Sequence, residues 1–252
     1  MKIIVYSTCG KESDIIDMFL RHTLTFADGI LLLLNNSDTA TEEIVRALAM
    51  DNPIDISKRE GEFKQVAFND ILLQKAISYQ ADVLMPLDCD EFPVAMGEEK
   101  DIRRIIESVI CHDKYLQYQW ATAIPMQEKE RYCLSDSFQV DWESKNGYKI
   151  ILPAALMDRG ISVIRGNHGL IGADSIDISD RLRLIHMPLR SVSQMKQKAE
   201  NYYRERVAAG NVQESSDFMQ VESAGKIEDG FKIMKHWVYN PENAKEFRFE
   251  NT

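Results

Sequence analysis

The sequence predicts an α/β fold built on a mostly parallel, Rossmann-like sheet flanked by helices, and two observations support this prediction. In the first 90 residues, short apolar runs alternate with stretches of helical periodicity, the pattern of right-handed βαβ units. Polar residues follow the apolar runs, and open parallel sheets bind ligands beyond the carboxyl ends of their strands. We expect one such domain over residues 1–208 and a C-terminal helical extension, residues 209–252, packed on it.

The first half supplies the parallel strands and the helices between them. Four leucines between Gly29 and Asn35 are too few for a buried helix, so this run is a strand. From Glu12 onward, apolar residues recur at helical spacing until Gly29. By the same criteria we expect strands at residues 2–6, 30–34, 54–56 and 83–87, and helices at residues 12–28, 41–50 and 65–79.

The second half has more strand and less helix, which predicts a small antiparallel portion. After a helix at residues 101–110, we expect strands at residues 115–121, 138–142, 148–152, 161–164 and 183–186. A helix at residues 191–208, a polar loop at residues 210–223 and an amphipathic helix at residues 227–238 complete the chain. Such a terminal helix more often docks on its own domain than on a membrane or partner.

Composition excludes several classes of protein. Thirty basic and forty acidic residues give a formal net charge of -10, which disfavours broad contact with nucleic acid or an anionic membrane. No apolar run approaches the ~18 residues that span a bilayer, although peripheral association stays open. The N-terminus lacks a secretory apolar region, and the four cysteines form no C-x-x-C pair. We therefore expect a cytoplasmic protein that binds no nucleic acid.

Two carboxylates stand at the end of the fourth predicted strand. Asp88 and Asp90 are two residues apart, so an extended chain points both to the same side and Cys89 to the other. Like charges so placed repel each other unless a cation lies between them, which is how proteins hold Mg²⁺ or Mn²⁺ on a diphosphate. An acidic turn that caps the next helix fits the spacing equally well.

Four segments resemble signatures of one enzyme family. Residues 84–92, LMPLDCDEF, resemble the D-x-D-E-F signature of family-2-like glycosyltransferases of the GT-A fold, and residues 11–16, KESDII, are similar to their K-N-E-x-D-I segment. Residues 35–39, NNSDT, stand where that family has D-N-x-S-x-D, and residues 184–191, LIHMPLRS, are similar to H-Y-P-x-R-S. The segments follow the family's order over roughly residues 1–200.

The sequence also departs from that pattern. Lys11 replaces an expected Asn, and Asn35 replaces an Asp that often contacts the nucleotide base. The E-D pair that often carries the catalytic base in these enzymes has no clear counterpart. The resemblance therefore leaves the identity of the donor and of the base open.

The resemblance implies a metal-dependent, inverting glycosyltransferase of cell-surface polysaccharide biosynthesis. Such an enzyme moves a sugar from a nucleotide-diphosphate donor, here expected to be a UDP-sugar, to a saccharide, lipid-linked or protein acceptor. The implied cofactor is Mn²⁺ or Mg²⁺, with Mn²⁺ favoured if a histidine is a ligand. The resemblance assigns the binding of base and ribose to Ser7, Thr8, Glu12, Asn35 and Asn36.

The same resemblance implies roles around the metal. Asp90 is the main expected ligand, and Asp88 contacts the ribose or the metal. His168, in a glycine-flanked loop, and His186, at the end of an apolar strand, are candidates for contact with the metal or the diphosphate. For any one histidine, a structural role in hydrogen bonding is the commoner case.

A basic segment offers a second contact for the diphosphate. Residues 181–206 contain seven basic and two acidic residues, a charge of +5 in an acidic chain. Arg190 and Ser191 stand where the following helix starts, and backbone N–H groups at a helix start bind anions. A solvated helix face is the alternative interpretation, above all for Arg204 and Arg206.

The catalytic base must be a carboxylate near the acceptor. Asp141 and Glu143 flank Trp142 in the segment after the acidic motif, and an aromatic ring beside a carboxylate suits a sugar. Both are therefore candidate catalytic residues, although both could equally be exposed turn residues.

Two other functions stay open from the sequence. A nucleotidyltransferase also uses a parallel sheet and paired aspartates, although residues 7–10, STCG, lack the glycine-rich phosphate loop it usually has. A non-catalytic module that binds sugar nucleotides would explain the missing E-D pair. An aspartyl phosphatase is disfavoured because its D-x-D motif follows the first strand.

Overall fold

The computed structural model contains an 11-stranded sheet whose first half is parallel. Strands β1 (Ile3–Cys9), β2 (Gly29–Asn35), β3 (Ile54–Arg59) and β4 (Val83–Pro86) lie in the order β3-β2-β1-β4, and all their pairings are parallel. The structure describes residues 1–62, 64–144, 147–178, 180–208, 221, 224–233 and 237–249.

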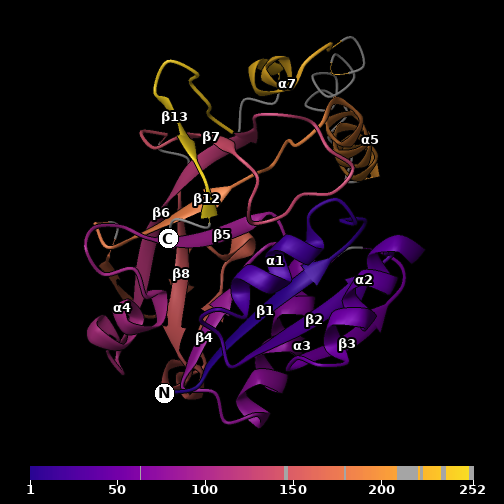
Figure 1. Ribbon diagram of the computed structural model, residues 1–252. Coiled ribbons are helices and arrows are strands. Elements are labelled where there is room, and N and C mark those ends of the chain that lie inside the picture. Colours follow the sequence, from indigo (N-terminus) through magenta and orange to yellow (C-terminus); the bar gives the residue numbers. More distant parts are fainter. Residues whose placement is uncertain are drawn as a thin grey trace.

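Helices cover both faces of these strands (Figure 1). Ile3 and Val5 of β1 belong to the same buried cluster as the apolar side of α1 (Ile16–Thr23) and Val45 of α2 (Thr39–Ala49). Ile4 and Tyr6 point to the opposite face and pack in the cluster of α3 (Gln65–Ser78). The continuous apolar runs of the sequence are thus strands buried on both faces, as parallel sheets require.

The second half of the sheet is largely antiparallel. Strand β8 (Tyr148–Pro153) lies antiparallel to β4 and joins the two halves. Beyond it lie β6 (Lys114–Pro125), β7 (Phe138–Asp141) and β13 (Ala244–Phe247), while β12 (Leu182–His186) pairs with β6 and with β5 (Glu91–Ala95). Strand β11 (Asp174–Asp177) pairs with β6, and β9 (Ser162–Val163) pairs with β10 (Leu170–Ile171) in a separate small sheet. The remaining elements are the helices α4 (Ile102–Val109), α5 (Val192–Ala208) and α7 (Ile227–Ile233) and the 3₁₀ turns η1 (Ala154–Arg159) and η2 (Arg165–Asn167).

This architecture confirms the predicted α/β class and differs from the prediction in detail. Helix α1 begins at Ile16 because residues before it form a turn, in which Glu12 O accepts the N–H groups of Ile15 and Ile16. Strands β5, β10, β11 and β13 were not expected. The predicted loop at residues 210–223 lies outside the described residues except for Val221.

The C-terminal extension contains a strand as well as a helix. β13 pairs antiparallel with β7. The apolar side of α7, Ile227 and Phe231, lies in one buried cluster with Leu189 and with Met195 of α5. Gly230 permits this approach, since a Cβ atom there would come within 2.2 Å of the Met195 sulfur. The described part of this segment therefore docks on the sheet and on α5.

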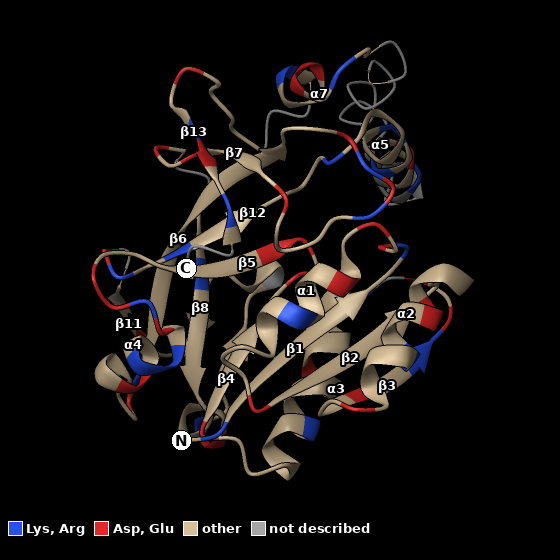
Figure 2. Ribbon diagram, viewed as in Figure 1, with Lys and Arg blue, Asp and Glu red and all other residues tan. Residues whose placement is uncertain are grey.

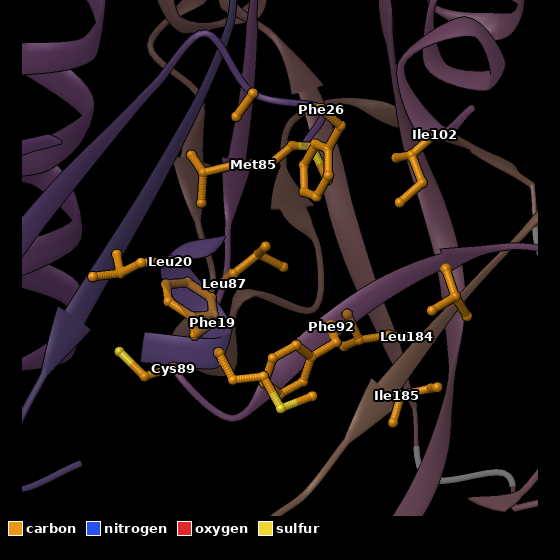
Figure 3. Close-up of a cluster of buried hydrophobic side chains, with 14 of the residues drawn as sticks. Phe19, Leu20, Phe26, Met85, Leu87, Cys89, Phe92, Ile102, Leu184 and Ile185 are labelled. Atoms are coloured by element: carbon orange, nitrogen blue, oxygen red, sulfur yellow. The ribbon is translucent and has the colours of Figure 1, made fainter. Parts of the chain in front are cut away.

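A buried cluster joins the two halves of the sheet beneath the acidic motif (Figure 3). Phe19 of α1 meets Phe92 of β5 edge to face, with ring centroids 6.3 Å apart. Leu184 and Ile185 of β12 and Leu87 belong to the same cluster. The segment that carries Asp88 and Asp90 is thus anchored at both ends by buried apolar side chains.

None of the helices within the described ranges is long and apolar enough to cross a bilayer.

The burial of His22 predicts a measurable loss of folding stability in acid. Its ring is buried against Phe26, Phe92 and Phe249, and Nε2 donates to Pro93 O at 2.7 Å. Burial lowers the pKa of His22 to about 4 in the folded protein. Because that pKa lies below the unfolded value of about 6.5, the stabilisation is complete above pH ~6.5 and is lost as pH falls towards 4.

We therefore expect His22→Phe to lose less stability than wild type between pH 7.5 and 4.5, by ~2–3 kcal/mol. Urea unfolding at both pH values measures the difference. His112→Phe, at an exposed histidine, is the control and should keep the wild-type dependence on pH. An unchanged slope for His22→Phe would show that His22 is not neutral in the folded protein.

Candidate active site

The acidic motif is a tight connection between β4 and β5. Glu91 N donates to Asp88 O at 3.1 Å, and the Asp88 N–H donates to the Glu91 carboxylate at 2.8 Å. Leu87 and Cys89 are buried, whereas the Asp88 side chain is 44% exposed and that of Asp90 only 8% exposed. The turn therefore presents one accessible and one buried carboxylate at the carboxyl end of β4.

Lys149 of β8 holds the accessible carboxylate. Its side chain is completely buried, and Nζ lies 3.0 Å from Asp88 Oδ2, 3.0 Å from Glu91 Oε2 and 3.0 Å from Gly166 O. Burial alone would lower the pKa of Lys149, but Asp88 and Glu91 raise it above its usual value. The ammonium group is therefore charged and has three acceptors.

Asp90 faces three potentially cationic side chains. Its Oδ2 lies 3.0 Å from Lys198 Nζ and 3.6 Å from Arg190 Nη1, and its Oδ1 lies 3.5 Å from His186 Nε2. Burial alone would raise the pKa of Asp90, but Lys198, His186 and Arg190 hold it well below its usual value. Asp90 is thus ionised at all physiological pH values.

Arg190 ties the start of the chain to this site. Its guanidinium group is fully buried and makes a bidentate contact with Asp14, Nε to Oδ2 at 2.7 Å and Nη2 to Oδ1 at 3.0 Å. It also contacts Glu12, and Nη1 donates to Met187 O at 3.1 Å. Burial opposes its charge, yet Glu12 and Asp14 raise the pKa of Arg190. Arg190 therefore positions both Asp90 and the turn that precedes α1. Its side chain presents no surface to a ligand.

Acidic and basic residues can be followed to the same region in Figure 2, at the beginning of β5 and around the beginning of α5. Within the described part of the chain, five carboxyl groups and three ammonium or guanidinium groups meet there. The carboxyl groups are those of Glu12, Asp14, Asp88, Asp90 and Glu91, and the cations are Lys149, Arg190 and Lys198.

Aromatic rings line the other side of the site. The Trp120 ring of β6 contacts His168, with centroids 5.0 Å apart, and His186, with centroids 4.9 Å apart. Trp237 lies 6.2 Å from His186, centroid to centroid. Trp120 Nε1 and His186 Nδ1 are buried and have no hydrogen-bond partner among the described residues. The structure thus brings both predicted histidines into contact with one indole ring.

The residues predicted to bind base and ribose lie at the ends of β1 and β2. Ser7 Oγ contacts Cys89 Sγ at 3.3 Å, and the Thr8 hydroxyl is buried with no partner in the described ranges. Asn35 and Asn36 donate to the loop after β3, both reaching Gly61 O. The rim of the parallel sheet is therefore polar, and its amides shape the neighbouring loop.

Ser191 caps α5 instead of leaving the helix start open. Its Oγ accepts the Gln194 N–H at 3.0 Å, and the Glu128 carboxylate accepts the Val192 N–H at 3.3 Å. Two of the backbone donors expected to bind a diphosphate are thus already used.

The two candidate catalytic carboxylates, those of Asp141 and Glu143, differ in burial and in hydrogen bonding. Asp141 is buried, and its two oxygens accept the N–H groups of Glu143 at 3.1 Å and Asn240 at 2.8 Å. Glu143 is exposed. The ring of Trp142, between them, packs on Phe247 with centroids 5.5 Å apart. The geometry gives Asp141 a role in shaping the turn and leaves Glu143 accessible.

Sheet register places these residues relative to the acidic motif. Glu91 pairs with His186, His186 with Thr122, and Thr122 with Asp141, so one row crosses β5, β12, β6 and β7. With strands ~4.8 Å apart, Asp141 lies ~10 Å from His186 along this row. The β7 end is therefore beside the site but not in contact with Asp90.

The donor set suits a divalent cation that a ligand and water help to bind. No cluster of three His, Cys, Asp or Glu side chains is preformed for a metal in the described residues. Asp90 Oδ1 and His186 Nε2 nevertheless face each other at 3.5 Å, longer than a normal hydrogen bond, beside the exposed Asp88. Carboxylate and imidazole ligands with open positions suit Mn²⁺.

Lys149 and Asp14 are among the residues of the site that were not assigned from the sequence. Lys149 is a lone lysine in an apolar strand, a pattern that signals a buried charge with a partner. Asp14 lies in the segment before α1, but its partner Arg190 is 176 residues away.

No protein-family model matches the chain, and no curated protein matches its sequence. Among solved structures, it is similar in fold to a fragment of TarS from S. aureus, with a TM-score of 0.48 and 10% identical residues over 79% of this chain and 64% of that one. It is also similar to mannosyltransferase PcManGT from Pyrobaculum calidifontis in complex with GDP-Man and Mn²⁺, with a TM-score of 0.49 and 11% identity over 93% and 68% of the two chains.

A third similar structure is GalNAc-T7 with UDP, GalNAc and Mn²⁺, with a TM-score of 0.49 and 11% identity over 74% of this chain and 44% of that one. The chain therefore spans less than two thirds of the length of the TarS fragment and of GalNAc-T7. The likeness to all three is one of fold.

Proposed function

We propose that the chain is a metal-dependent, inverting glycosyltransferase that uses a UDP-sugar or a related nucleotide sugar and a saccharide, lipid-linked or protein acceptor. The observation that carries the proposal is the site at the carboxyl end of β4. There an exposed and a buried aspartate lie beside the polar ends of β1 and β2, backed by buried cations. Such a rim is where open α/β sheets bind nucleotides.

In this proposal the donor spans the rim from β2 to β5. The base and ribose lie against Ser7, Thr8 and the Asn35–Asn36 corner, at the polar ends of β1 and β2. Asp88 and Asp90 hold a divalent cation on the diphosphate, with His186 as a third ligand. That cation would neutralise the charge that develops on the departing diphosphate.

Buried side chains position Asp88 and Asp90 and exclude water from the buried side of this centre. Arg190 and Lys149 fix Asp90 and Asp88 from the buried side. Trp120 is buried against His168 and His186 and forms the apolar wall behind this centre. Ligand sites commonly combine an apolar lining with a few well-placed polar groups.

We keep Glu143 as the candidate base for the acceptor hydroxyl, because its carboxylate is accessible and that of Asp141 is occupied by backbone N–H groups. Glu143→Gln is expected to lower transfer ~10²- to 10⁴-fold, the usual contribution of general-base catalysis. Donor affinity, measured by calorimetry, should change less than about twofold, because Glu143 does not touch the donor. Transfer at the wild-type rate by Glu143→Gln would assign the base elsewhere.

One assay separates the three functions that the sequence leaves open. The protein is incubated with UDP-Glc, UDP-GlcNAc, UDP-Gal or GDP-Man and Mn²⁺, and nucleoside diphosphate release is followed over time. We expect slow release with one of these donors, because water replaces the acceptor. Release of pyrophosphate from a nucleoside triphosphate and sugar phosphate would instead identify a nucleotidyltransferase, and donor binding without any release would identify a non-catalytic module.

A further inference from the structure

Lys198 of α5 occupies the carboxylate that the proposal gives to the metal. Its Nζ lies 3.0 Å from Asp90 Oδ2 and 3.1 Å from Pro188 O, and 4.8 Å from the centroid of the Trp237 ring. Its side chain is 20% exposed, whereas Lys149 and Arg190 are completely buried. Lys198 is therefore the cation of this site that also reaches the solvent side.

The three cations differ in how firmly they are fixed. Arg190 is bound to two carboxylates besides Asp90, and Lys149 has three acceptors around its ammonium group. Lys198 reaches Asp90 from a helix through a flexible four-carbon side chain that is 20% exposed, and such a side chain can turn its ammonium group to a new partner. The ring of Trp237 provides a face over which the ammonium group can remain while it moves.

A divalent cation on Asp90 would add its charge to a carboxylate that already has Lys198 and Arg190 as cationic partners. Asp90 is the buried carboxylate nearest to His186, and Lys198 lies within hydrogen-bonding distance of it. In a site shielded from water such a cation would repel both groups strongly, and Lys198 is the less buried of the two. A diphosphate that binds together with the cation brings new oxygen acceptors. These can replace Asp90 Oδ2, the acceptor that Lys198 would lose.

We propose that Lys198 exchanges partners during donor binding. In the free protein its ammonium group neutralises Asp90. When a nucleoside diphosphate and a divalent cation bind, the cation takes Asp90 and the ammonium group moves to the diphosphate, where it offsets the charge of the leaving group. This inference rests on the proposed function, and it makes Lys198 a competitor of the metal in one state and a ligand of the donor in the other.

Removing the charge of Lys198 should therefore change two affinities in opposite directions. We expect Lys198→Met to bind Mn²⁺ alone about tenfold more tightly than wild type, measured by electron paramagnetic resonance of free Mn²⁺. The same variant should bind UDP about tenfold more weakly at saturating Mn²⁺, measured by calorimetry. Lys198→Gln, which keeps a hydrogen-bond donor without the charge, should shift both affinities in the same directions.

Two controls make the result specific. Lys196→Met removes a charge two residues earlier on α5, on the opposite side of the helix, and should change neither affinity by more than about twofold. Thermal unfolding of each variant confirms that it is folded under the assay conditions.

Equal affinities in wild type and Lys198→Met would overturn the exchange. A fall in the affinities for both Mn²⁺ and UDP would overturn it too, because the loss of a lysine with a purely structural role would weaken both. A wild-type protein that binds none of UDP, GDP and CDP with Mn²⁺ would refute the proposed function itself, and that failure is visible without any variant.

Discussion

Asp90→Asn is expected to lower release of nucleoside diphosphate from the donor on the order of 10³-fold, or ~4 kcal/mol of activation free energy. The substitution removes the negative charge that Lys198, Arg190 and the proposed metal share, while the side chain keeps its size. The assay is the time course of diphosphate release at saturating donor and Mn²⁺.

The matched control for this prediction is Asp17→Asn. Asp17 forms an exposed pair with Arg21 on α1, 2.9 Å from Nε to Oδ2, and should leave the rate unchanged. Circular dichroism and thermal unfolding establish that Asp90→Asn is folded at the assay temperature. A folded Asp90→Asn protein that keeps more than a tenth of the wild-type rate would remove Asp90 from the catalytic machinery.

Arg190→Met is expected to destabilise the protein by ~3–5 kcal/mol, the cost of removing one partner from a buried ion network. The substitution leaves Asp14, Glu12 and Asp90 facing one another without the guanidinium group that now separates them. Urea unfolding of wild type and variant at pH 7.5 measures the difference. Arg204→Met, which breaks an exposed pair on α5, should cost less than ~1 kcal/mol.

The penalty of Arg190→Met should also depend on pH. Burial already raises the pKa of Glu12 in the wild type, and Arg190 opposes that rise, so without Arg190 the pKa of Glu12 should rise further. A raised carboxyl pKa destabilises the folded state most above that pKa, so the difference from wild type should shrink as pH falls from 8 to 4.5. A penalty that is constant over this range would assign the loss to packing rather than to charge.

The α/β class could be predicted because the relevant signals are local. Apolar runs such as residues 30–34 and helical spacing such as that of α3 depend on neighbouring residues, and the structure places them as expected. Strand β5 was missed because Glu91 and Pro93 make a five-residue strand look like a turn. β13 is short and largely exposed, so it lacks the apolar pattern of a strand.

The site was predictable only in part, for a physical reason. Asp88 and Asp90 were found because their spacing and position at a strand end are chemical signals in themselves. Lys149 meets Asp88 across 61 residues, and Arg190 meets Asp14 across 176, so their roles depend on how the sheet brings distant segments together. For Asp141 a local signal was misleading. Its position beside Trp142 made it a candidate catalytic residue, but its two oxygens accept the backbone N–H groups of Glu143 and Asn240 and so stabilise a turn.

The most direct test of the central claim is calorimetric titration of wild type and Asp90→Asn with UDP-Glc, UDP-GlcNAc, UDP-Gal and GDP-Man, with and without Mn²⁺. We predict that wild type binds at least one of these donors, that Mn²⁺ strengthens this binding at least tenfold, and that Asp90→Asn loses the Mn²⁺-dependent part. Absence of binding to all of them, or equal Mn²⁺-dependent binding by folded Asp90→Asn, would contradict a nucleotide-sugar site at the carboxyl end of β4.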